Sequence, residues 1–237
     1  MNSAIEIIAE VNKLANLVRA NSSMRYFKTE FGQYGYGDKF IGITNPQIHQ
    51  IVKDSREVPL QEITPLLQND IHEIRLLGFL MLVDRYKRAK DSKTKNIIYD
   101  VYMTNIDFVN NWDIVDITAP KIIGSHLATN PKKIQILTSL ARSNSLWYRR
   151  IAILSTFHDI STGSSDCAFA IISILKNDSQ DLIQKAVGWC LREIGKNIDE
   201  KVLIHYLDEN HRNLPRTTLR YAIERLPEQI RKSYLKK

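Results

Sequence analysis

A short helical pattern recurs along this chain. Each copy has a basic residue, a small residue two or three places later, and then aliphatic residues. The copies are Arg75–Gly78, Arg150–Ala152, Lys185–Gly188 and Arg220–Ala222. Their basic residues are 75, 35 and 35 positions apart, so a further member is expected near residue 112, where Trp112–Asp116 lies. A period of roughly 37 residues between helices is typical of α-solenoids built from HEAT or armadillo repeats. We therefore expect an all-α chain, an α-solenoid of HEAT-like helical repeats with a concave basic groove.

The composition and the hydrophobic periodicity agree with long helices. The 237 residues include only 9 glycines and 7 prolines, about half of the roughly 12% in average proteins. Apolar residues recur at helical spacing, as in Ile74, Leu77 and Met81, and no segment alternates as a strand does. The main irregularity is a glycine-rich loop from Gly32 to Gly42. An ordinary helical bundle remains the alternative to a solenoid.

Local signals mark where helices begin. Proline in a first helical turn is expected at Asn45-Pro46, Asn130-Pro131 and Leu214-Pro215. Aspartates that precede apolar-periodic segments are candidate N-caps, namely Asp70, Asp91, Asp178 and Asp199. These signals are spread along the whole chain, and we expect one repeat domain over residues 1–237.

Several sequence features predict the compartment. The longest apolar run, Leu76 to Val83, is too short for a membrane-spanning helix. The first 20 residues indicate an amphipathic helix rather than a signal peptide. Two cysteines, Cys167 and Cys190, are too few for a disulfide framework. We expect a cytoplasmic monomer that has no membrane association.

The charge distribution favours an anionic partner. The formal net charge is +7, and residues 212–237 hold eight basic and two acidic side chains. Basic and aromatic residues also alternate in segments 25–28 and 147–150. Such patches attract phosphate backbones, with binding that weakens steeply as salt increases. In a solenoid, the recurring basic position would form a ladder along the groove. The alternative is a solvated surface kept for solubility, and we prefer this interpretation for the last six residues.

The three tryptophans, Trp112, Trp147 and Trp189, each lie in or beside a repeat position. On a helix, Trp112 and Asp116 share a face because they are four residues apart. The spacing thus places an indole next to a carboxylate, an arrangement suited to a cationic substrate on a polyanion. Burial in the core is the alternative for any single tryptophan.

Four segments resemble the AlkD-type DNA alkylation-repair glycosylases. They are YGYGDKFIGIT (34–44), NNWDIVD (110–116), LWYRRIAIL (146–154) and LIQKAVGWCLREIGK (182–196). The resemblance covers nearly the whole chain. It implies an α-solenoid of HEAT-like repeats that holds duplex DNA in a basic concavity and excises N3- and N7-alkylated purines. It also implies no metal and no organic cofactor.

The resemblance assigns roles to five residues. The catalytic aspartate falls on Asp116 and the active-site arginine on Arg150. Trp112 and Trp189 match the flanking tryptophans, and Tyr26 matches an aromatic residue near the DNA. Further DNA contacts are expected from Asp113, Trp147, Arg149, Lys185 and Arg220.

This assignment has a plausible chemistry. An alkylated purine with a fixed positive charge leaves a sugar of oxocarbenium character, which Asp116 would stabilise while it positions or deprotonates water. Trp112 and Trp189 would hold the cation, and Arg150 a flanking phosphate. No lysine adjoins Asp116 to form a Schiff base, so hydrolysis to an abasic site is favoured. An open solenoid face suggests no pocket for a rotated base, which favours recognition of the lesion from the backbone side.

Alternatives remain at two levels. Asp113 is the rival for the catalytic role, although we favour a helix N-terminal charge for it. Pro120 predicts a kink beside Asp116. The lone histidines His49, His126, His158, His205 and His211 are interpreted as surface or capping residues. The alternative functions are a DNA-binding repeat protein without activity and a protein–protein scaffold.

Overall fold

The computed structural model describes residues 1–236, which divide into two compact units, residues 1–118 and 119–236. Residues 1–236 contain no β-strand, only one isolated bridge pair between Lys39 and Ile71. The all-α prediction is therefore confirmed. Lys237, counted above in the basic segment, lies outside the described residues. None of the helices within residues 1–236 is long and apolar enough to cross a membrane.

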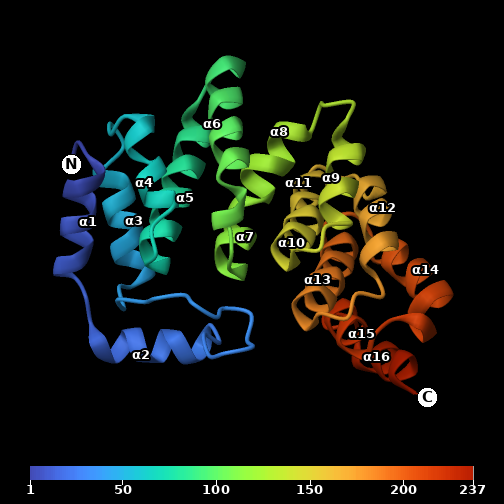
Figure 1. The fold of residues 1–237 in the computed structure, drawn as a ribbon. Helices are drawn as coiled ribbons and strands as arrows, with labels where there is room; N and C mark the ends of the chain where they lie inside the picture. Colours follow the sequence, from blue (N-terminus) through green and yellow to red (C-terminus); the bar gives the residue numbers. More distant parts are fainter. Residues whose placement is uncertain (237) are drawn as a thin grey trace. The chain divides into compact units, whose positions relative to one another are not determined.

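The first unit is built around one long central helix. Its elements are α1 (Ala4–Lys13), α2 (Leu17–Tyr26), α3 (Asn45–Asp54), η1 (Leu60–Glu62), α4 (Thr64–Leu67), α5 (His72–Arg88), α6 (Ser92–Thr104), η2 (Ile106–Phe108) and α7 (Trp112–Thr118). The central helix α5 packs against α3, α4, α6 and α7 and is buried along most of its length. Its middle, residues 76–83, is apolar on all sides, as a helix segment enclosed by others must be. The short α2 lies crosswise to α1 and α3 (Figure 1).

The second unit is also built around one long central helix. Its elements are η3 (Pro120–Gly124), α8 (Ser125–Leu127), α9 (Lys133–Ala141), α10 (Leu146–Ser155), α11 (Phe157–Ser161), α12 (Asp166–Leu175), α13 (Asp181–Asn197), α14 (Glu200–Asn210), η4 (His211–Asn213), α15 (Arg216–Ala222) and α16 (Glu228–Leu235). Helix α13 packs against α10, α11, α12, α14 and α15. Like α5, it is 17 residues long.

The recurring sequence pattern falls on helices in every case, namely α5, α10, α13 and α15. Its small residue permits close helix packing. A Cβ on Gly188 of α13 would lie 2.4 Å from the main-chain oxygen of Thr218 in α15. A Cβ on Gly78 of α5 would lie 3.0 Å from Cβ of Leu66 in α4. The pattern thus records where neighbouring helices approach one another most closely.

Some predicted helix starts are confirmed. Pro46 lies in the first turn of α3, and the side chains of Asp91 and Asp199 cap α6 and α14. Pro215 is the N-cap of α15, whereas α9 begins two residues after Pro131.

The predicted N-caps Asp70 and Asp178 are wrong. Helix α5 is preceded by Ile71 and α13 by Gln180. Asp70 instead pairs with Lys39 at 2.9 Å, and Asp178 pairs with Nε of Arg149 at 2.6 Å. In both cases, the carboxylate forms an ion pair with a basic residue from another part of the chain and does not cap the helix that follows it.

The predicted kink at Pro120 is confirmed as a change of helix type. Helix α7 ends at Thr118, and a π-helical turn follows from Pro120 to Gly124. Proline has no N–H to donate to the carbonyl of Asp116, so the α-helical hydrogen-bond ladder stops there. Asp116 therefore lies in the last turn of a short helix.

The glycine-rich loop is the main irregularity of the first unit, as predicted. Gly42 adopts a φ of +79°, and a Cβ there would lie 2.2 Å from the main-chain oxygen of Asn16. Its N–H donates to Oε1 of Glu73 at 2.7 Å, and its oxygen accepts from Nε of Arg19 at 2.7 Å. Glycine is required here, and through it the loop is fixed to both α2 and α5.

Gly188→Ala is expected to destabilise the second unit by about 1–3 kcal/mol, because the added methyl group meets main-chain atoms of α15 that cannot rotate away. Urea denaturation followed by circular dichroism measures this change. Ser173→Ala, on the exposed side of α12, serves as the control and should stay within about 0.5 kcal/mol of the wild type. Equal stability of the two variants would contradict the packing explanation.

Candidate functional site

The first unit contains a cavity of about 440 Å³. Its lining includes four residues singled out in the sequence, Tyr26, Trp112, Asp113 and Asp116. They come from the end of α2 and from α7, and His72 and Glu73 at the start of α5 also line it. The expectation that this protein offers no pocket is therefore wrong. We refer to this space as the aromatic cavity.

Stacked rings form one wall of the aromatic cavity. Phe27 stacks on Phe40 with 5.0 Å between ring centroids and on Trp112 with 5.3 Å. Tyr26, which is 66% exposed, meets the indole of Trp112 edge-on at 5.9 Å. Phe27 follows α2 directly and Phe40 lies in the glycine-rich loop, so the fixed course of that loop sets the wall. Such a rigid π surface attracts cations.

Two carboxylates of α7 line the same cavity, Asp113 and Asp116. They are three residues apart, which places them side by side on the helix. The side chain of Asp113 is engaged with the chain itself. Its Oδ1 accepts from the N–H of Ile114 at 2.8 Å, and its Oδ2 lies 2.8 Å from Nε2 of His72. Asp116 is partly exposed and lines the cavity rather than lying sealed in the core.

His72 is a site residue that the sequence analysis missed. It is the first residue of α5, it is 1% exposed, and its ring stacks on Phe40 at 4.6 Å. Nδ1 lies 3.4 Å from Oδ2 of Asp38, on the opposite side from Asp113. Burial opposes a charge on this ring, but the two carboxylates outweigh burial and raise the pKa of His72 to about 9. The imidazole is therefore protonated at neutral pH.

A buried charge cluster surrounds His72. We define the His72 cluster as Asp38, His72, Arg75, Asn111 and Asp113. Arg75 pairs with Oδ1 of Asp38, and Nδ2 of Asn111 donates to Oδ2 of Asp38 at 2.9 Å. Although burial opposes it, these cations and hydrogen bonds lower the pKa of the Asp38 carboxyl. Two positive and two negative charges thus balance inside the cluster, as buried ion pairs must.

The position of Arg75 corrects one sequence hypothesis. Arg75 is 3% exposed and also donates to the main-chain oxygen of Asn69 at 2.8 Å. The basic ladder is therefore wrong at its first member, because this guanidinium lies inside the fold. A sequence signal for it did exist. The lone Asp38 in a glycine-rich loop needs a buried cation if the loop folds inward.

Glu73 anchors the loop from the cavity side. Its carboxylate accepts from the N–H groups of Ile41 and Gly42, the latter at 2.7 Å. Backbone donors thus surround this carboxylate, and its role is to hold the glycine-rich loop in place.

In the second unit, α10 and α13 pack together and carry two predicted site residues. Arg150 of α10 is 5% exposed, and its Nη1 donates to the main-chain oxygen of Leu182 at 2.6 Å. Trp189 of α13 is partly exposed. Its Nε1 donates to Glu193 at 3.1 Å, and its indole meets Phe157 edge-on at 4.9 Å.

The remaining predicted contacts also lie in the second unit. Nη1 of Arg149 donates to the main-chain oxygen of Ser143 at 3.1 Å, in addition to its pair with Asp178. Lys185 pairs with Asp181 at 2.7 Å one turn earlier in α13. Trp147 is partly exposed in α10, and Arg220 is exposed on α15. Arg220 therefore has the most accessible charge among these predicted contacts.

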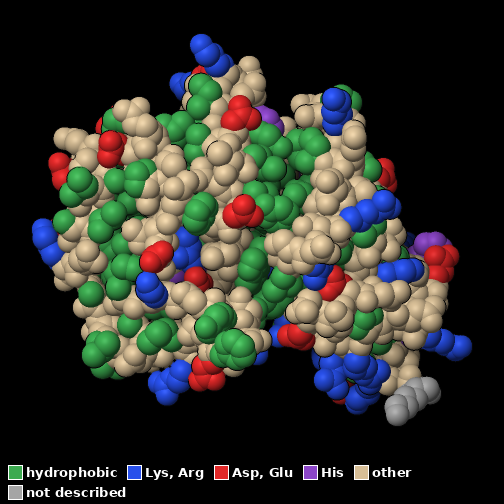
Figure 2. Space-filling view, viewed as in Figure 1, with side chains coloured by type: hydrophobic (Ala, Val, Ile, Leu, Met, Phe, Trp, Pro, Cys, Tyr) green, Lys and Arg blue, Asp and Glu red, His purple; other side chains and the backbone are tan. Residues whose placement is uncertain are grey.

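The basic C-terminal segment forms a positive surface of the second unit. Figure 2 shows blue side chains gathered over α15 and α16. The exposed basic residues of this segment are Arg212, Arg216, Arg220, Arg225, Arg231, Lys232 and Lys236. The predicted concentration of positive charge is thus accessible to a polyanion.

Among residues 1–236, no group of three His, Cys, Asp or Glu side chains is arranged as metal ligands. Cys190 is fully buried, and burial raises the pKa of its thiol to about 12, as is typical of a cysteine that packs in the core.

Comparison with known proteins gives a family and a fold. The family model described as DNA alkylation repair enzyme matches residues 7–226. A solved structure from Enterococcus faecalis, described as a predicted DNA alkylation repair enzyme, is similar to this chain with a TM-score of 0.70 and 21% identity. The similarity covers 90% of this chain and 97% of that one. No curated protein matches. The predicted all-α fold of helical repeats is thereby confirmed.

His72→Gln should remove a pH-dependent contribution to stability. Since the pKa of His72 is about 9 in the folded protein and its ordinary value is 6.5, this contribution is fully present below pH 6.5 and is lost as pH rises through 9. Its size is about 3 kcal/mol at most, from the linkage of pKa to free energy.

Urea denaturation between pH 6 and pH 10 measures this contribution. The difference in free energy of unfolding between wild type and His72→Gln should decrease from pH 6 to pH 10. The difference between wild type and His49→Gln, on the exposed side of α3, should not change with pH. A difference for His72→Gln that stays constant with pH would show that His72 is not held as the cation.

Proposed function

The chain belongs to the DNA alkylation repair enzyme family, and from this premise we propose that it is a monofunctional DNA glycosylase. Its role in the repair of alkylated DNA and DNA as its substrate follow from the family. The proposed reaction hydrolyses the N-glycosidic bond of cationic alkylated purines in duplex DNA, of the 3-methyladenine and 7-methylguanine type. The product is an abasic site for base excision repair.

The observation that carries this proposal is the pairing of Asp116 with Trp112 in the aromatic cavity. The two residues are one helical turn apart on α7, so the indole and the carboxylate reach the same space. Both groups favour a positive charge, the ring through its π face and the carboxylate through its charge. A sugar that becomes oxocarbenium-like as the base departs has that charge.

The assignment of Asp116 rather than Asp113 rests on their different surroundings. Asp113 neutralises the buried imidazolium of His72 and accepts from the main chain. A carboxylate committed to a buried cation is poorly suited to stabilise a second cation. Asp116 is partly exposed and lines the aromatic cavity, so water and a substrate reach its carboxylate. We therefore assign the chemistry to Asp116 and a positioning role to Asp113.

The proposed reaction needs one carboxylate only. The bond between C1′ and the purine nitrogen breaks, and its electron pair neutralises the positive charge of the departing base. That base leaves as a neutral molecule, so no general acid has to protonate it. Water adds to C1′, and its proton passes to Asp116. The two-carboxylate arrangement of ordinary glycoside hydrolysis is accordingly not required.

The second unit is proposed to hold the DNA. Arg220 and the exposed basic residues of α15 and α16 provide the phosphate contacts, with Lys185 and Arg149 on α13 and α10. Arg150 is 5% exposed and donates to the main-chain oxygen of Leu182, so we assign it a positioning role between α10 and α13 in place of the phosphate contact that the sequence suggested. Trp189 and Trp147 are assigned to the sugar and base side, as is Tyr26 in the first unit. The protein would act as a monomer, with its helices as HEAT-like repeats, in the cytoplasm beside chromosomal DNA.

Asp116→Asn is expected to lower the release of free methylated base by about 100-fold or more, because the amide can neither accept the proton of water nor offset the sugar's charge. The assay incubates methylated duplex DNA with the protein and measures free 7-methylguanine and 3-methyladenine by chromatography. Binding to undamaged duplex should remain within a few-fold of wild type.

Asp100→Asn, an exposed carboxylate change on α6, is the matched control and should retain full release. Undiminished release by Asp116→Asn would refute the proposed mechanism. Binding of methylated DNA without any release by the wild type would favour a DNA-binding protein that lacks activity.

Arg220→Gln is expected to weaken duplex binding and to reduce the slope of log K against log salt by about one, as loss of one phosphate contact does. Fluorescence anisotropy with a labelled duplex at several salt concentrations measures the slope. Lys53→Gln, an exposed change on α3, is the control. If both variants keep the wild-type slope, the phosphate contacts lie elsewhere.

A further inference from the structure

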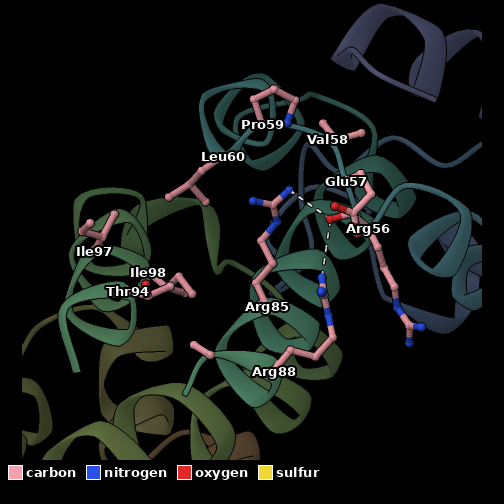
Figure 3. A pocket seen from close by; sticks show the side chains of 11 residues that line it. Arg56, Glu57, Val58, Pro59, Leu60, Arg85, Arg88, Thr94, Ile97 and Ile98 are labelled. Atoms are coloured by element: carbon pink, nitrogen blue, oxygen red, sulfur yellow. Dashed lines mark hydrogen bonds between the residues drawn. The ribbon is translucent and has the colours of Figure 1, made fainter. Parts of the chain in front are cut away.

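A second cavity of about 430 Å³ lies at the other end of the central helix α5 (Figure 3). The aromatic cavity adjoins the first residues of α5, whereas this one adjoins its last turn. A helix rises about 1.5 Å per residue, so His72 and Arg88 are about 24 Å apart along it. The second cavity is therefore separate from the proposed catalytic site.

The positive lining comes from Arg56, Arg85 and Arg88. In Figure 3, the side chains of Arg85 and Arg88 extend from α5 toward the segment 56–60. Both donate to one acceptor, the main-chain oxygen of Arg56, at 3.3 and 3.4 Å. Two guanidinium groups thus converge on a single uncharged oxygen, which leaves most of their charge without compensation at that point.

Nearby acids compensate only part of this charge. Asp84 pairs with Arg88 at 2.8 Å and with Arg56 at 3.2 Å. Glu57 also lines the cavity and attracts Arg85. The three arginines thus exceed these two acids by one positive charge.

Arg85 is the cation with the poorest compensation. No carboxylate of residues 1–236 forms a salt bridge with it, and its buried Nε has no hydrogen-bond partner within that part of the chain. Burial, together with the neighbouring charge of Arg88, lowers the pKa of Arg85. An anion placed between the two guanidinium groups would relieve both the repulsion and the missing hydrogen bond.

Another part of the lining is an aliphatic wall. In Figure 3, Leu60 from the segment before α4 and Ile97 and Ile98 from α6 lie on the other side of Arg85 from Glu57. Ile97 is 45% exposed, so its side chain is accessible to a ligand. A ligand that places an apolar body against this wall would cover it.

We propose that this cavity binds a small organic phosphate monoester, such as a nucleoside 5′-monophosphate, with its phosphate between Arg85 and Arg88. A phosphate monoester has up to two negative charges and several acceptor oxygens, which suits convergent guanidinium groups better than a single carboxylate. Its organic part packs on Leu60, Ile97 and Ile98. The volume lies within the usual range for ligand pockets of about 300–1,000 Å³. This inference does not depend on the proposed glycosylase activity.

Isothermal titration calorimetry of the full chain with adenosine 5′-monophosphate tests the proposal. Saturable binding is expected, with adenosine not binding and inorganic phosphate binding more weakly. Arg85→Gln and Arg88→Gln should each raise the Kd about tenfold or more, as loss of a charged hydrogen bond does. Arg142→Gln, an exposed change directly after α9, is the matched control and should leave the Kd unchanged.

Four outcomes would overturn the proposal. The first is the absence of saturable binding at millimolar nucleotide, and the second is wild-type affinity for the nucleotide in both arginine variants. The third is an affinity for inorganic phosphate equal to that for the nucleotide. The fourth is an effect of Arg85→Gln on binding of a short duplex but not on binding of the nucleotide. Far-UV circular dichroism verifies that each variant is folded. The side chain of Arg88 is 42% exposed, so its replacement should leave the fold intact. If Arg85→Gln does not fold, the nucleotide affinity of Arg88→Gln tests the proposal.

Discussion

The buried pairing of the His72 imidazolium with Asp113 and Asp38 is the interaction on which the rest of the first unit depends. It joins α5, α7 and the glycine-rich loop at one point inside the protein. A buried cation is tolerated only where carboxylates and hydrogen bonds replace its hydration. The course of the loop and the orientation of α7 are thus linked. Together they decide which side chains of α7 line the aromatic cavity.

This arrangement separates two carboxylates that are equivalent in the sequence. Asp113 balances His72, while Asp116, one turn later, adjoins the indole of Trp112 in the cavity. In the proposed function, the first fixes the helix and the second acts on the sugar. In other enzymes too, two carboxylates of one active site have different roles because their surroundings differ. The rigid stack of Phe27 on Trp112 then defines where a cation can lie.

Local spacing was enough to predict the helices, the closeness of Trp112 and Asp116, and the break at Pro120, since each depends on residues within about one turn. The His72 cluster was not predictable in this way. Its members are brought together by the path of the loop and by helix packing across long stretches of chain. The same long-range effect made Asp70 and Asp178 ion-pair partners rather than N-caps, and buried Arg75 where the repeat pattern suggested a surface position.

The different roles of the two carboxylates are tested by single-turnover release of 7-methylguanine, compared between Asp113→Asn and Asp116→Asn after both variants are verified as folded. Asp116→Asn is expected to lose release almost completely. Asp113→Asn, whose amide can still accept a hydrogen bond from His72, should keep a measurable fraction. The reverse order, with Asp113 indispensable and Asp116 replaceable, would contradict the division of roles that the His72 cluster implies.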